Sequence, residues 1–573
     1  MSVAECIDRS IGWDKLPRVL GLPTLIGLRE RLQRDNLFDT GVPDSDGLSL
    51  TQCAYRAADG KWNDLTHPMM GAVNTHFGRN VRPAHHIPEP ELALLTPHPR
   101  TVSRTLLTRD RFLPATTLNM LAGAWLQFEI HDWFSHGSNE KAPFVLPVEP
   151  GDPWPREALV IERTGRGDAP GVFPSEDTHW WDGSQIYGNC AEKQAQVRDG
   201  ARLKVERGTI PTCLAGDFFD FAGQHAGFWT GWAAMHTLFA LEHNAICAHL
   251  SSKEKRLRGD AEKLFQTARL VNVALMAKIH TTEWTPAIIA HPTTRTGMKM
   301  SWWGISERLK RSIGRVSTKE AISGIPGSRA NHYGVPYSLT EEFAAAYRMH
   351  PLMPDDFVFR SPFGGTDRRP MSLAELRTTQ AIPVLRDLGM PTVLYTFGIS
   401  HPGAITLHNY PRTLQEFDHR GTLSDLATID VLRDRERGVP RYNRFRKAFH
   451  KAPVRDFAQL SANPVWVEEI RDVYDGDIDN VDLMIGLLAE PPPRGFGFSD
   501  TAFRVFLLMA SRRLKSDRFF TDCYNAEHYT EAGLDWIDNN SMKTVLLRHF
   551  RRELEDVLEP VENAFLPWAP VAG

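Results

Sequence analysis

A chain of 573 residues is long enough for several domains and buries a large core in any common fold. Its formal charge of −4 excludes a bulk electrostatic attraction to nucleic acid. The sequence contains no run of about 18 apolar residues, so we expect no membrane-spanning helix. The 6 cysteines show no C-x-x-C spacing, and the N-terminus has no basic and apolar leader pattern, so we expect a reduced, cytoplasmic setting without a secretory signal.

Helical periodicity dominates the chain, and alternating strand patterns are scarce. Proline-rich loops separate the helical segments, as at 83–99, 142–155 and 491–493. The predicted helices cover residues 114–136, 228–250, 261–282, 339–350, 501–516 and 542–558. We therefore predict one mostly α domain over 1–573, with a core at about 100–558 and an N-terminal helical extension at 1–60.

The first distinctive segment, residues 16–33, is amphipathic and partly basic. Such a segment can lie on a membrane surface as a peripheral contact. It can equally pack its apolar residues on the core, and this second interpretation is favoured.

The predicted helix around Gln127 and His131 is apolar nearly all round, which is typical of a buried helix. Because unpaired polar groups are costly to bury, its few polar side chains need partners. Gln127 and His131 are four residues apart and share one face. Asp132 comes next in the sequence and points about 100° away around the helix.

The run from Tyr347 to Asp355 contains a phenol three residues before an imidazole. Ser338-x-x-Glu341 reads as a capping box that starts a helix, and Pro351 is expected to end it near His350. Residues three apart lie on one helix face, so both side chains can reach one site. Haem iron commonly takes a proximal histidine, and a nearby phenol could then be oxidised. The alternative is a buried Tyr and His in an ordinary helix.

The pattern Tyr-x-x-His-Pro-Leu-x-Pro-Asp at 347–355 resembles the proximal motif of cyclooxygenases and fatty-acid α-dioxygenases, in the animal-type haem peroxidase superfamily. The pattern Gln-x-x-x-His at 127–131 resembles the distal haem side of that superfamily. The resemblance implies a single-domain, mostly helical haem peroxidase fold. It makes His350 the ligand of the haem iron, His131 the distal proton carrier, Gln127 a nearby hydrogen-bond donor and Tyr347 the radical-forming residue.

The same resemblance implies a structural calcium ion. Family members use the Asp after the distal His together with a loop, and the loop here is Thr178-His-Trp180-Trp-Asp182-Gly-Ser184. All donors are oxygens, as a hard cation requires. The implied ligands are the side chains of Asp132, Thr178, Asp182 and Ser184 and the carbonyl of Trp180.

Three positions depart from the myeloperoxidase-type members of the superfamily, which bind haem through ester bonds. Ile130 stands at one ester position and Phe228 at the other, and the distal arginine position falls at His225. The resemblance therefore implies non-covalent haem b and argues against a dedicated peroxidase.

The segment from Asp430 to Asn443 also resembles the superfamily. Its arginines, Arg433 first and Arg435 next, are expected to hold the haem propionates through paired hydrogen bonds. Asp430 is expected to accept a hydrogen bond from the proximal imidazole and to make His350 a stronger donor to iron. The alternative is a charged helix with solvated salt bridges.

The substrate site is implied by the α-dioxygenase pattern His280-Thr-Thr-Glu-Trp-Thr285, together with an arginine in Ser511–Phe520. In α-dioxygenases these residues bind a fatty-acid carboxylate. Arg512 lies opposite the apolar stripe of its predicted helix, in a second apolar face where it needs an anion, and is our first choice. Arg513 is the second choice, and a structural ion pair is the alternative.

The resemblance implies a haem-dependent fatty-acid α-dioxygenase that adds dioxygen at C2 of a fatty acid through a tyrosyl radical. We expect a peroxide activator, no nucleic-acid partner and a monomer. Three alternatives stay open: a haem peroxidase acting on small donors, a mid-chain fatty-acid dioxygenase, and a non-enzymatic haem or lipid carrier.

Overall fold

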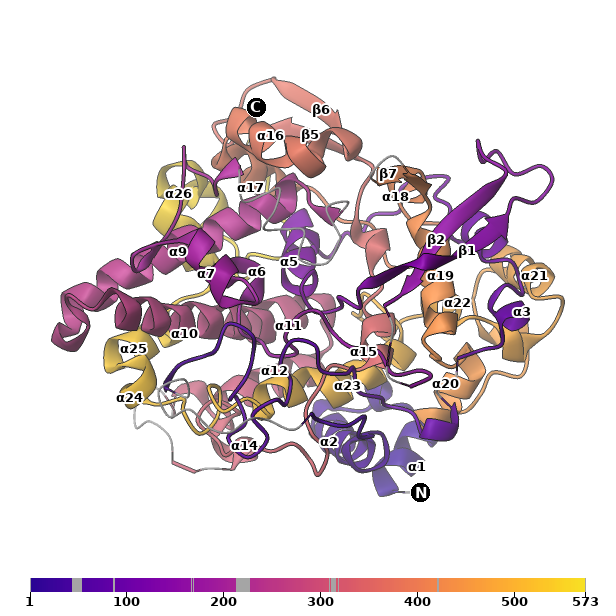
Figure 1. Ribbon diagram of the computed structural model, residues 1–573, viewed down its shortest axis with the longest axis horizontal. Helices are drawn as coiled ribbons and strands as arrows, with labels where there is room; N and C mark the ends of the chain where they lie inside the picture. The colour runs from indigo at the N-terminus through magenta and orange to yellow at the C-terminus, as the bar shows by residue number, and fades with distance from the viewer. Residues whose placement is uncertain are drawn as a thin grey trace.

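Two long helices, α9 (Thr230–Lys253) and α10 (Ala261–Ile279), lie side by side in the computed structural model (Figure 1). Every residue of α10 from Phe265 to Ile279 is buried. The helix α5 (Met120–Ile130) packs on α9 and is buried nearly all round, as its apolar sequence predicts. The structure describes residues 2–43, 54–85, 88–165, 167, 169–212, 227–308, 310, 316, 317, 319–419 and 422–571.

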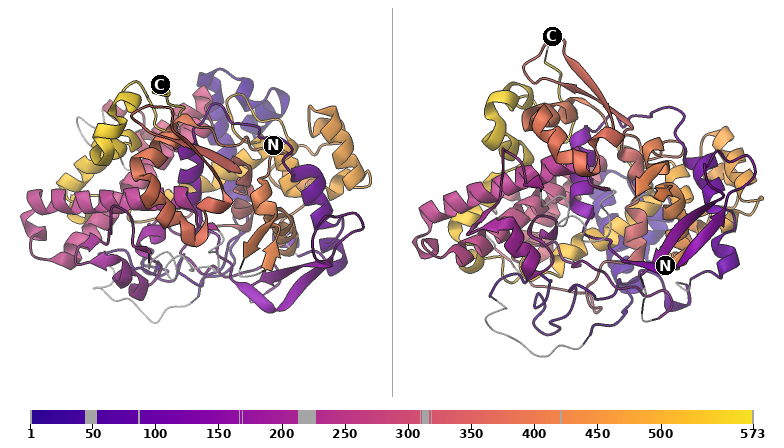
Figure 2. Two further views of the ribbon diagram at one scale, coloured as in Figure 1. Left: turned by 90° about the horizontal axis from the view of Figure 1, so that it is seen from above. Right: turned by 45° about the horizontal axis from the view of Figure 1, so that its top comes forward.

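Further helices surround this centre (Figures 1 and 2). Those of seven or more residues are α1 (Val3–Ser10), α2 (Arg18–Asp35), α7 (Ala191–Val197), α12 (Pro292–Trp303), α16 (Ala381–Leu388), α17 (Met390–Ile399), α19 (Leu426–Glu436), α20 (Tyr442–Ala448), α21 (Pro464–Val473), α22 (Leu483–Ala489), α23 (Asp500–Lys515), α25 (Glu531–Asn539) and α26 (Met542–Leu558). The fold is a single, mostly helical domain, which confirms the predicted fold class.

Strands occur in the described ranges only as four antiparallel pairs. The longest pair, β1 with β2, projects from the helices in Figure 1 and carries a bulge between Asn139 and Phe144. The strands are β1 (Ser138–Pro147), β2 (Ala158–Thr164), β3 (Arg198–Asp199), β4 (Arg202–Leu203), β5 (Asp356–Arg360), β6 (Arg368–Ser372), β7 (Phe417–His419) and β8 (Thr422–Ser424). The loop predicted at 142–155 is therefore wrong in its first part, because β1 continues to Pro147.

Three predicted helices are confirmed with nearly the expected bounds: α9, α23 and α26. The helix predicted at 261–282 ends at Ile279 and continues as a π-turn and α11 (Thr285–Ile288). The helix predicted at 114–136 is wrong at both ends, since α5 begins after Asn119 and ends at Ile130. The side-chain amide of Asn119 donates to two carbonyls near the C-terminus, those of Ala564 and Leu566.

The helix predicted at 339–350 is also much shorter. The helix α15 covers Glu341–Ala346, and its N-cap is Thr340, whose hydroxyl accepts a hydrogen bond from an amide of the first turn. The capping box predicted at Ser338 is wrong. Backbone hydrogen bonds to Gly78 keep the chain before Thr340 extended, so a tertiary contact overrides the local signal.

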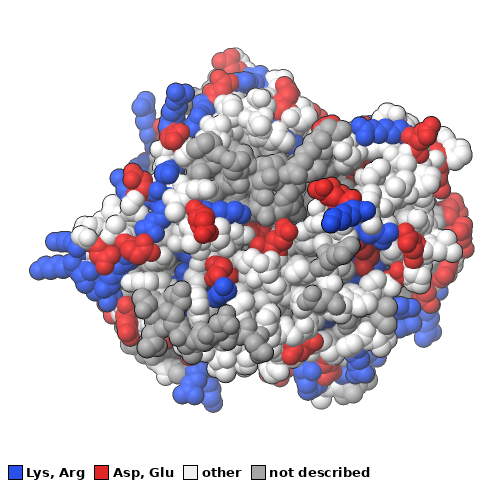
Figure 3. Space-filling view, viewed as in Figure 1, with Lys and Arg blue, Asp and Glu red and all other residues white. Residues whose placement is uncertain are grey.

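Residues 16–33 pack on the core, as the favoured interpretation predicted. Within α2, Leu25, Leu28 and Leu32 are buried, and the helix contacts α12 and α23. Val19 and Leu20 stay exposed on its outer side. Among the described residues, no helix is long and apolar enough to span a bilayer. The face in Figure 3 intersperses Lys and Arg with Asp and Glu, without one broad basic field.

A buried ion pair ties residues 77–81 to α15, the helix that leads to Tyr347. The Arg79 guanidinium contacts Glu342 Oε1 at 2.8 Å, and both side chains are 0% exposed. The second carboxylate oxygen of Glu342 accepts a hydrogen bond from the Asn80 amide at 2.7 Å. The pair is therefore fully desolvated and fully bonded.

Replacing Glu342 by leucine is expected to lower the free energy of unfolding by about 3–5 kcal/mol, because Arg79 would remain buried without its partner. Denaturation by guanidinium chloride would measure the loss. The matched control is Glu555→Leu, which removes an exposed partner of Arg551 and should cost at most about 1 kcal/mol. Equal midpoints for the two variants would contradict a structural role for the buried pair.

Candidate active site

Tyr347 and His350 do not lie on one continuous helix. The helix α15 ends at Ala346 with Tyr347 as its C-cap, and a 3-10 turn then runs from His350 to Leu352. The expectation of a shared helix face is therefore wrong. Pro351 has no N–H to continue the helical ladder, and it is well suited to the first turn of a new segment.

Arg109 holds the loop that follows His350. Its Nη2 donates to the carbonyls of Pro351 at 3.2 Å and Met353 at 2.9 Å. Its Nη1 pairs with Asp355 at 2.9 Å. One buried guanidinium thus fixes the backbone on which the imidazole is mounted, and sequence patterns around Tyr347 gave no signal for it.

The predicted contact between Asp430 and His350 is present. The Nδ1 atom of His350 lies 2.8 Å from Asp430 Oδ2, and Tyr410 donates its hydroxyl to the same oxygen at 3.0 Å. Asp430 is buried on α19. With Nδ1 occupied by a carboxylate, Nε2 of His350 is the nitrogen left to bind a metal.

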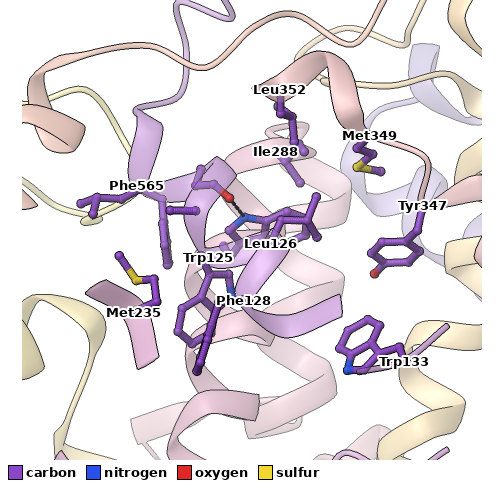
Figure 4. Packing of buried hydrophobic residues seen from close by; sticks show 14 of the residues in the cluster. Trp125, Leu126, Phe128, Trp133, Met235, Ile288, Tyr347, Met349, Leu352 and Phe565 are labelled. Carbon is purple, nitrogen blue, oxygen red and sulfur yellow. Dashed lines mark hydrogen bonds between the residues drawn. The ribbon is translucent and has the colours of Figure 1, made fainter. Parts of the chain in front are cut away.

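The Tyr347 phenol is buried in an aromatic wall. Its ring stacks on Phe506 at 4.5 Å and meets Phe343 at 4.6 Å and Trp133 at 5.7 Å. Figure 4 shows the hydroxyl directed toward the side where Trp133 lies. Burial raises the pKa of Tyr347, so the phenol keeps its proton.

Gln127 and His131 lie at the end of α5, with His131 as the C-cap in helical conformation. The Gln127 amide donates to Gly227 O at 3.1 Å and accepts from Trp229 Nε1. Both of its polar ends therefore already have protein partners, which fixes the direction of the side chain.

His131 is held by its Nδ1, which lies 3.1 Å from Phe128 O. Its ring packs on Trp232 with centroids 3.8 Å apart. Burial lowers the pKa of His131 well below its ordinary value. The imidazole is therefore neutral, and among the described residues its Nε2 has no hydrogen-bond partner, so it can accept a proton.

Arg435 is not available to a ligand, and the prediction that it holds a propionate is wrong. Its Nε and Nη2 bind both oxygens of Asp482 at 2.8 and 2.6 Å. Its Nη1 donates to the carbonyls of Leu94 and Pro97, each at 2.7 Å. The reason is tertiary: a carboxylate 47 residues further along the chain satisfies this arginine completely.

Arg433 and Arg437 are half-buried on the same stretch. Arg433 pairs with Glu436 at 2.6 Å. Arg437, which sequence reasoning did not select, donates Nε to Thr164 Oγ1 at 3.2 Å and has no ion pair within the described ranges. Burial lowers the pKa of Arg437 to about 10, although the nearby Glu341 opposes the shift. An arginine without a carboxylate partner favours an anionic ligand.

The predicted calcium ligands do come together. Ser184 donates its hydroxyl to Asp132 Oδ2, and Thr178 donates its hydroxyl to Asp182 Oδ2 at 3.0 Å. Burial, with the nearby Asp182, raises the pKa of Asp132 to about 7, against a hydrogen bond from Ser184. Asp132 Oδ1 is buried without a partner. These facing oxygens suit a hard cation.

The Trp180 carbonyl, the fifth predicted ligand, accepts a hydrogen bond from Arg513 Nη2 at 2.5 Å. A carbonyl oxygen has two lone pairs, so this bond leaves one for a cation. Asp177 is a further buried acid in the neighbourhood, and burial together with Asp132 raises its pKa. The sequence analysis did not select Asp177.

His280 is the centre of an indole-lined site. Its Nδ1 accepts a hydrogen bond from Trp125 Nε1 at 3.2 Å, and its ring stacks on Trp284 with centroids 4.6 Å apart. Thr285 donates its hydroxyl to the His280 carbonyl at 2.8 Å, across the π-turn. Burial lowers the pKa of His280 to about 3, assisted by the nearby Arg513, so the imidazole is neutral.

Arg512 faces away from this site. Its Nη2 donates to the carbonyls of Val335 at 2.7 Å, Pro336 at 3.1 Å and His332 at 3.3 Å. These carbonyls fix the direction of the guanidinium, but Nε of Arg512 is buried without a partner, so the expectation that it needs an anion stays a prediction.

Arg513 is the arginine that reaches the site. Its guanidinium carbon lies 4.1 Å over the Trp133 ring and 5.5 Å over the Trp181 ring. The His280 ring meets the same two indoles at 6.5 and 5.0 Å. Arg513 Nη1 is buried without a partner. Tyr347 also packs on Trp133. The indole of Trp133 therefore lies beside the Tyr347 phenol, the His280 imidazole and the Arg513 guanidinium, whose Nη1 has no partner.

Comparisons with known proteins identify the family of this chain. A model of the animal haem peroxidase family matches residues 55–561. The chain is 35% identical to α-dioxygenase 2 of Arabidopsis thaliana, over 99% of this chain and 92% of that protein. It superposes on the crystal structure of the fatty acid α-dioxygenase of Oryza sativa with a TM-score of 0.92, at 31% identity, covering 99% of this chain and 97% of that one. A tyrosine-to-phenylalanine variant of the rice protein, crystallised with palmitic acid, gives a TM-score of 0.90 at 30% identity.

This chain belongs to the α-dioxygenases of the animal haem peroxidase family. A more distant match, peroxidase A of Dictyostelium discoideum, is 18% identical with a TM-score of 0.67 and shares the fold.

Haem, which the family name implies, fits the two histidines of this α-dioxygenase. In each of His350 and His131, Nδ1 lies within 3.1 Å of a protein oxygen and Nε2 is left for chemistry, the usual arrangement of metal-site imidazoles. Ile130 and Phe228 are apolar at the positions where the esters of myeloperoxidase-type members form. His225 lies outside the described residues.

Proposed function

We propose that this protein is a fatty-acid α-dioxygenase that adds dioxygen to C2 of a fatty acid and gives a 2-hydroperoxy fatty acid. The observation that carries the proposal is the shared contact of Tyr347, His280 and Arg513 with Trp133. It brings a guanidinium and a neutral imidazole, groups that can bind a carboxylate, to the same indole as an oxidisable phenol. In a related rice structure the ligand is palmitic acid, which supports the substrate class.

The carboxylate site determines which carbon reacts. Because His280 is neutral, the charge of the fatty-acid head group is met by Arg513, with a hydrogen bond from His280. Thr285 can add a second hydrogen bond when its hydroxyl turns from the His280 carbonyl to the head group. A head group held there places C2, the carbon next to it, closest to the phenol. Holding the reacting atoms in this order is a proximity contribution to the rate.

Haem, when bound and activated by a peroxide, would supply the one-electron oxidation of Tyr347. The Tyr347 hydroxyl loses a hydrogen atom, and the phenoxyl radical then removes one from C2. Dioxygen adds to the carbon radical, and the peroxyl radical recovers a hydrogen atom from Tyr347. The net reaction is insertion of O2 into the C2–H bond. The hydroperoxide can then lose carbon dioxide and water to give an aldehyde one carbon shorter.

Non-covalent haem b would be held by His350 on the proximal side and by Arg433 and Arg437 at the propionates. Arg437 supports this assignment because it lacks an ion-pair partner in the part of the chain that the structure describes. On the distal side, His131 Nε2 would accept the proton of an incoming peroxide, and Gln127 would be held beside it.

Palmitate is expected to drive oxygen uptake by the haem-loaded protein without a continuous supply of peroxide. Mass spectrometry should find a product that carries two added oxygen atoms at C2, and the aldehyde one carbon shorter. Oxygen at a mid-chain carbon would instead indicate a mid-chain dioxygenase. Oxidation of small donors with no oxygen uptake would indicate a peroxidase, and bound fatty acid without either reaction would indicate a carrier.

A calcium ion would neutralise Asp132, would add to the charge that the buried Arg269 already sets 3.7 Å from Asp182, and would tie the 178–184 loop to the end of α5, next to His131. Asp132→Asn is therefore expected to reduce bound calcium, measured by elemental analysis, and to lower the melting temperature. Chelation of wild-type protein should reproduce the lower melting temperature. A variant with full calcium content would contradict this ligand assignment.

A further inference from the structure

Three polar groups converge on the carboxylate next to His350. His350 Nδ1 and the Tyr410 hydroxyl approach Asp430 Oδ2 at 2.8 and 3.0 Å. The other oxygen, Oδ1, accepts a hydrogen bond from Arg348 Nη1. Asp430 therefore has two partners, Tyr410 and Arg348, besides the imidazole that the sequence analysis assigned to it.

Arg348 has a particular place in this network. It lies between Tyr347 and His350 in the chain, and its side chain is only 13% exposed. Its Nε donates to Asp434 Oδ1 at 2.9 Å, so one guanidinium bridges two carboxylates one turn apart on α19. The segment that carries the phenol and the imidazole is thereby tied to the helix that carries Asp430.

We infer that Arg348 is a positioning and charge-balancing residue that limits how strongly Asp430 activates His350 as an iron ligand. The inference rests on the proposed haem function. The property that Arg348 would adjust is the reduction potential of the haem. This potential decides how readily haem can oxidise Tyr347, the residue before Arg348 in the chain.

The direction of the effect follows from charge. A carboxylate that accepts a hydrogen bond from an imidazole makes the imidazole a better donor to iron, and this favours the ferric state. Arg348 and Tyr410 donate hydrogen bonds to the same carboxylate and so reduce the electron donation from His350 to iron. In a buried site such charge-assisted bonds are strong, because little water screens them. Removing either donor should therefore lower the ferric/ferrous reduction potential.

The test is the reduction potential of the haem-loaded protein, measured without fatty acid. Arg348→Gln is expected to shift the ferric/ferrous equilibrium about tenfold toward ferric, which is about 59 mV for a one-electron couple. Tyr410→Phe should shift it in the same direction by less, because no charge is lost. The matched control is Arg551→Gln, which removes a 65% exposed arginine and should leave the potential unchanged.

A double-mutant cycle with Asp430→Asn separates this inference from a general field effect. If Arg348 acts through Asp430, Arg348→Gln should have a much smaller effect in the Asp430→Asn background. Equal shifts in both backgrounds, or no shift in either, would overturn the inference. Arg348→Lys, which keeps the charge, should restore most of the potential and also checks for damage to the fold. Because no oxygenation is measured, failure of the proposed function would not be mistaken for failure of this inference.

Discussion

Tyr347→Phe is expected to abolish oxygen uptake with palmitate while the protein keeps its haem absorption spectrum. Phenylalanine fills the same aromatic wall formed by Phe506, Phe343 and Trp133, so the fold should be retained. It has no hydroxyl hydrogen to lose, however, and hydrogen abstraction from C2 has no other agent in the proposal. Oxygen-electrode traces and spectra of the same samples would measure both properties.

The control for this substitution is Tyr395→Phe. Tyr395 is equally buried on α17, but its hydroxyl accepts a hydrogen bond from the Val571 amide and does not face the Trp133 wall. This variant should keep oxygen uptake. Uptake at the wild-type rate by Tyr347→Phe would remove the phenol from the reaction, while a lost haem spectrum would assign Tyr347 to cofactor binding.

Periodicity in the sequence located the long buried helices because burial itself sets the pattern. The helices α9, α23 and α26 have nearly the bounds that their apolar spacing predicts. The short helix α15 was overestimated. Its ends are decided by the pairing with Gly78 and by the break before His350, and neither lies in the local pattern.

The candidate site divides in the same way. Asp430 and His350 were paired from motif positions alone, and the structure places them 2.8 Å apart. The partners of the arginines were harder to predict, because a long side chain can reach carboxylates and carbonyls that are far away in the sequence. Arg435 binds Asp482, and Arg512 binds the carbonyl of Val335. Such partners appear only once the chain is folded, so neighbouring residues could not show which arginine remains for a ligand.

Arg513→Gln is expected to lower kcat/KM for palmitate by about 10–100-fold, the equivalent of roughly 1.5–3 kcal/mol for a hydrogen bond to a charged group. Arg512→Gln should have little effect on kcat/KM, although it can lower stability by leaving backbone carbonyls without a donor. Since His280 is neutral, no other cation at this site replaces the lost charge among the residues that the structure describes.

Methyl palmitate distinguishes a lost head-group contact from a disturbed site. The ester carries no charge, so wild type and Arg513→Gln should oxidise it at similarly low rates if Arg513 acts by binding the carboxylate. Because Arg513 also donates to the carbonyls of His179 and Trp180 beside the predicted calcium ligands, calcium content must be measured in the same samples. Normal calcium with a selective loss on palmitate would assign Arg513 to the substrate. An equal loss on the acid and the ester would instead show that its main task is to hold the 178–184 loop.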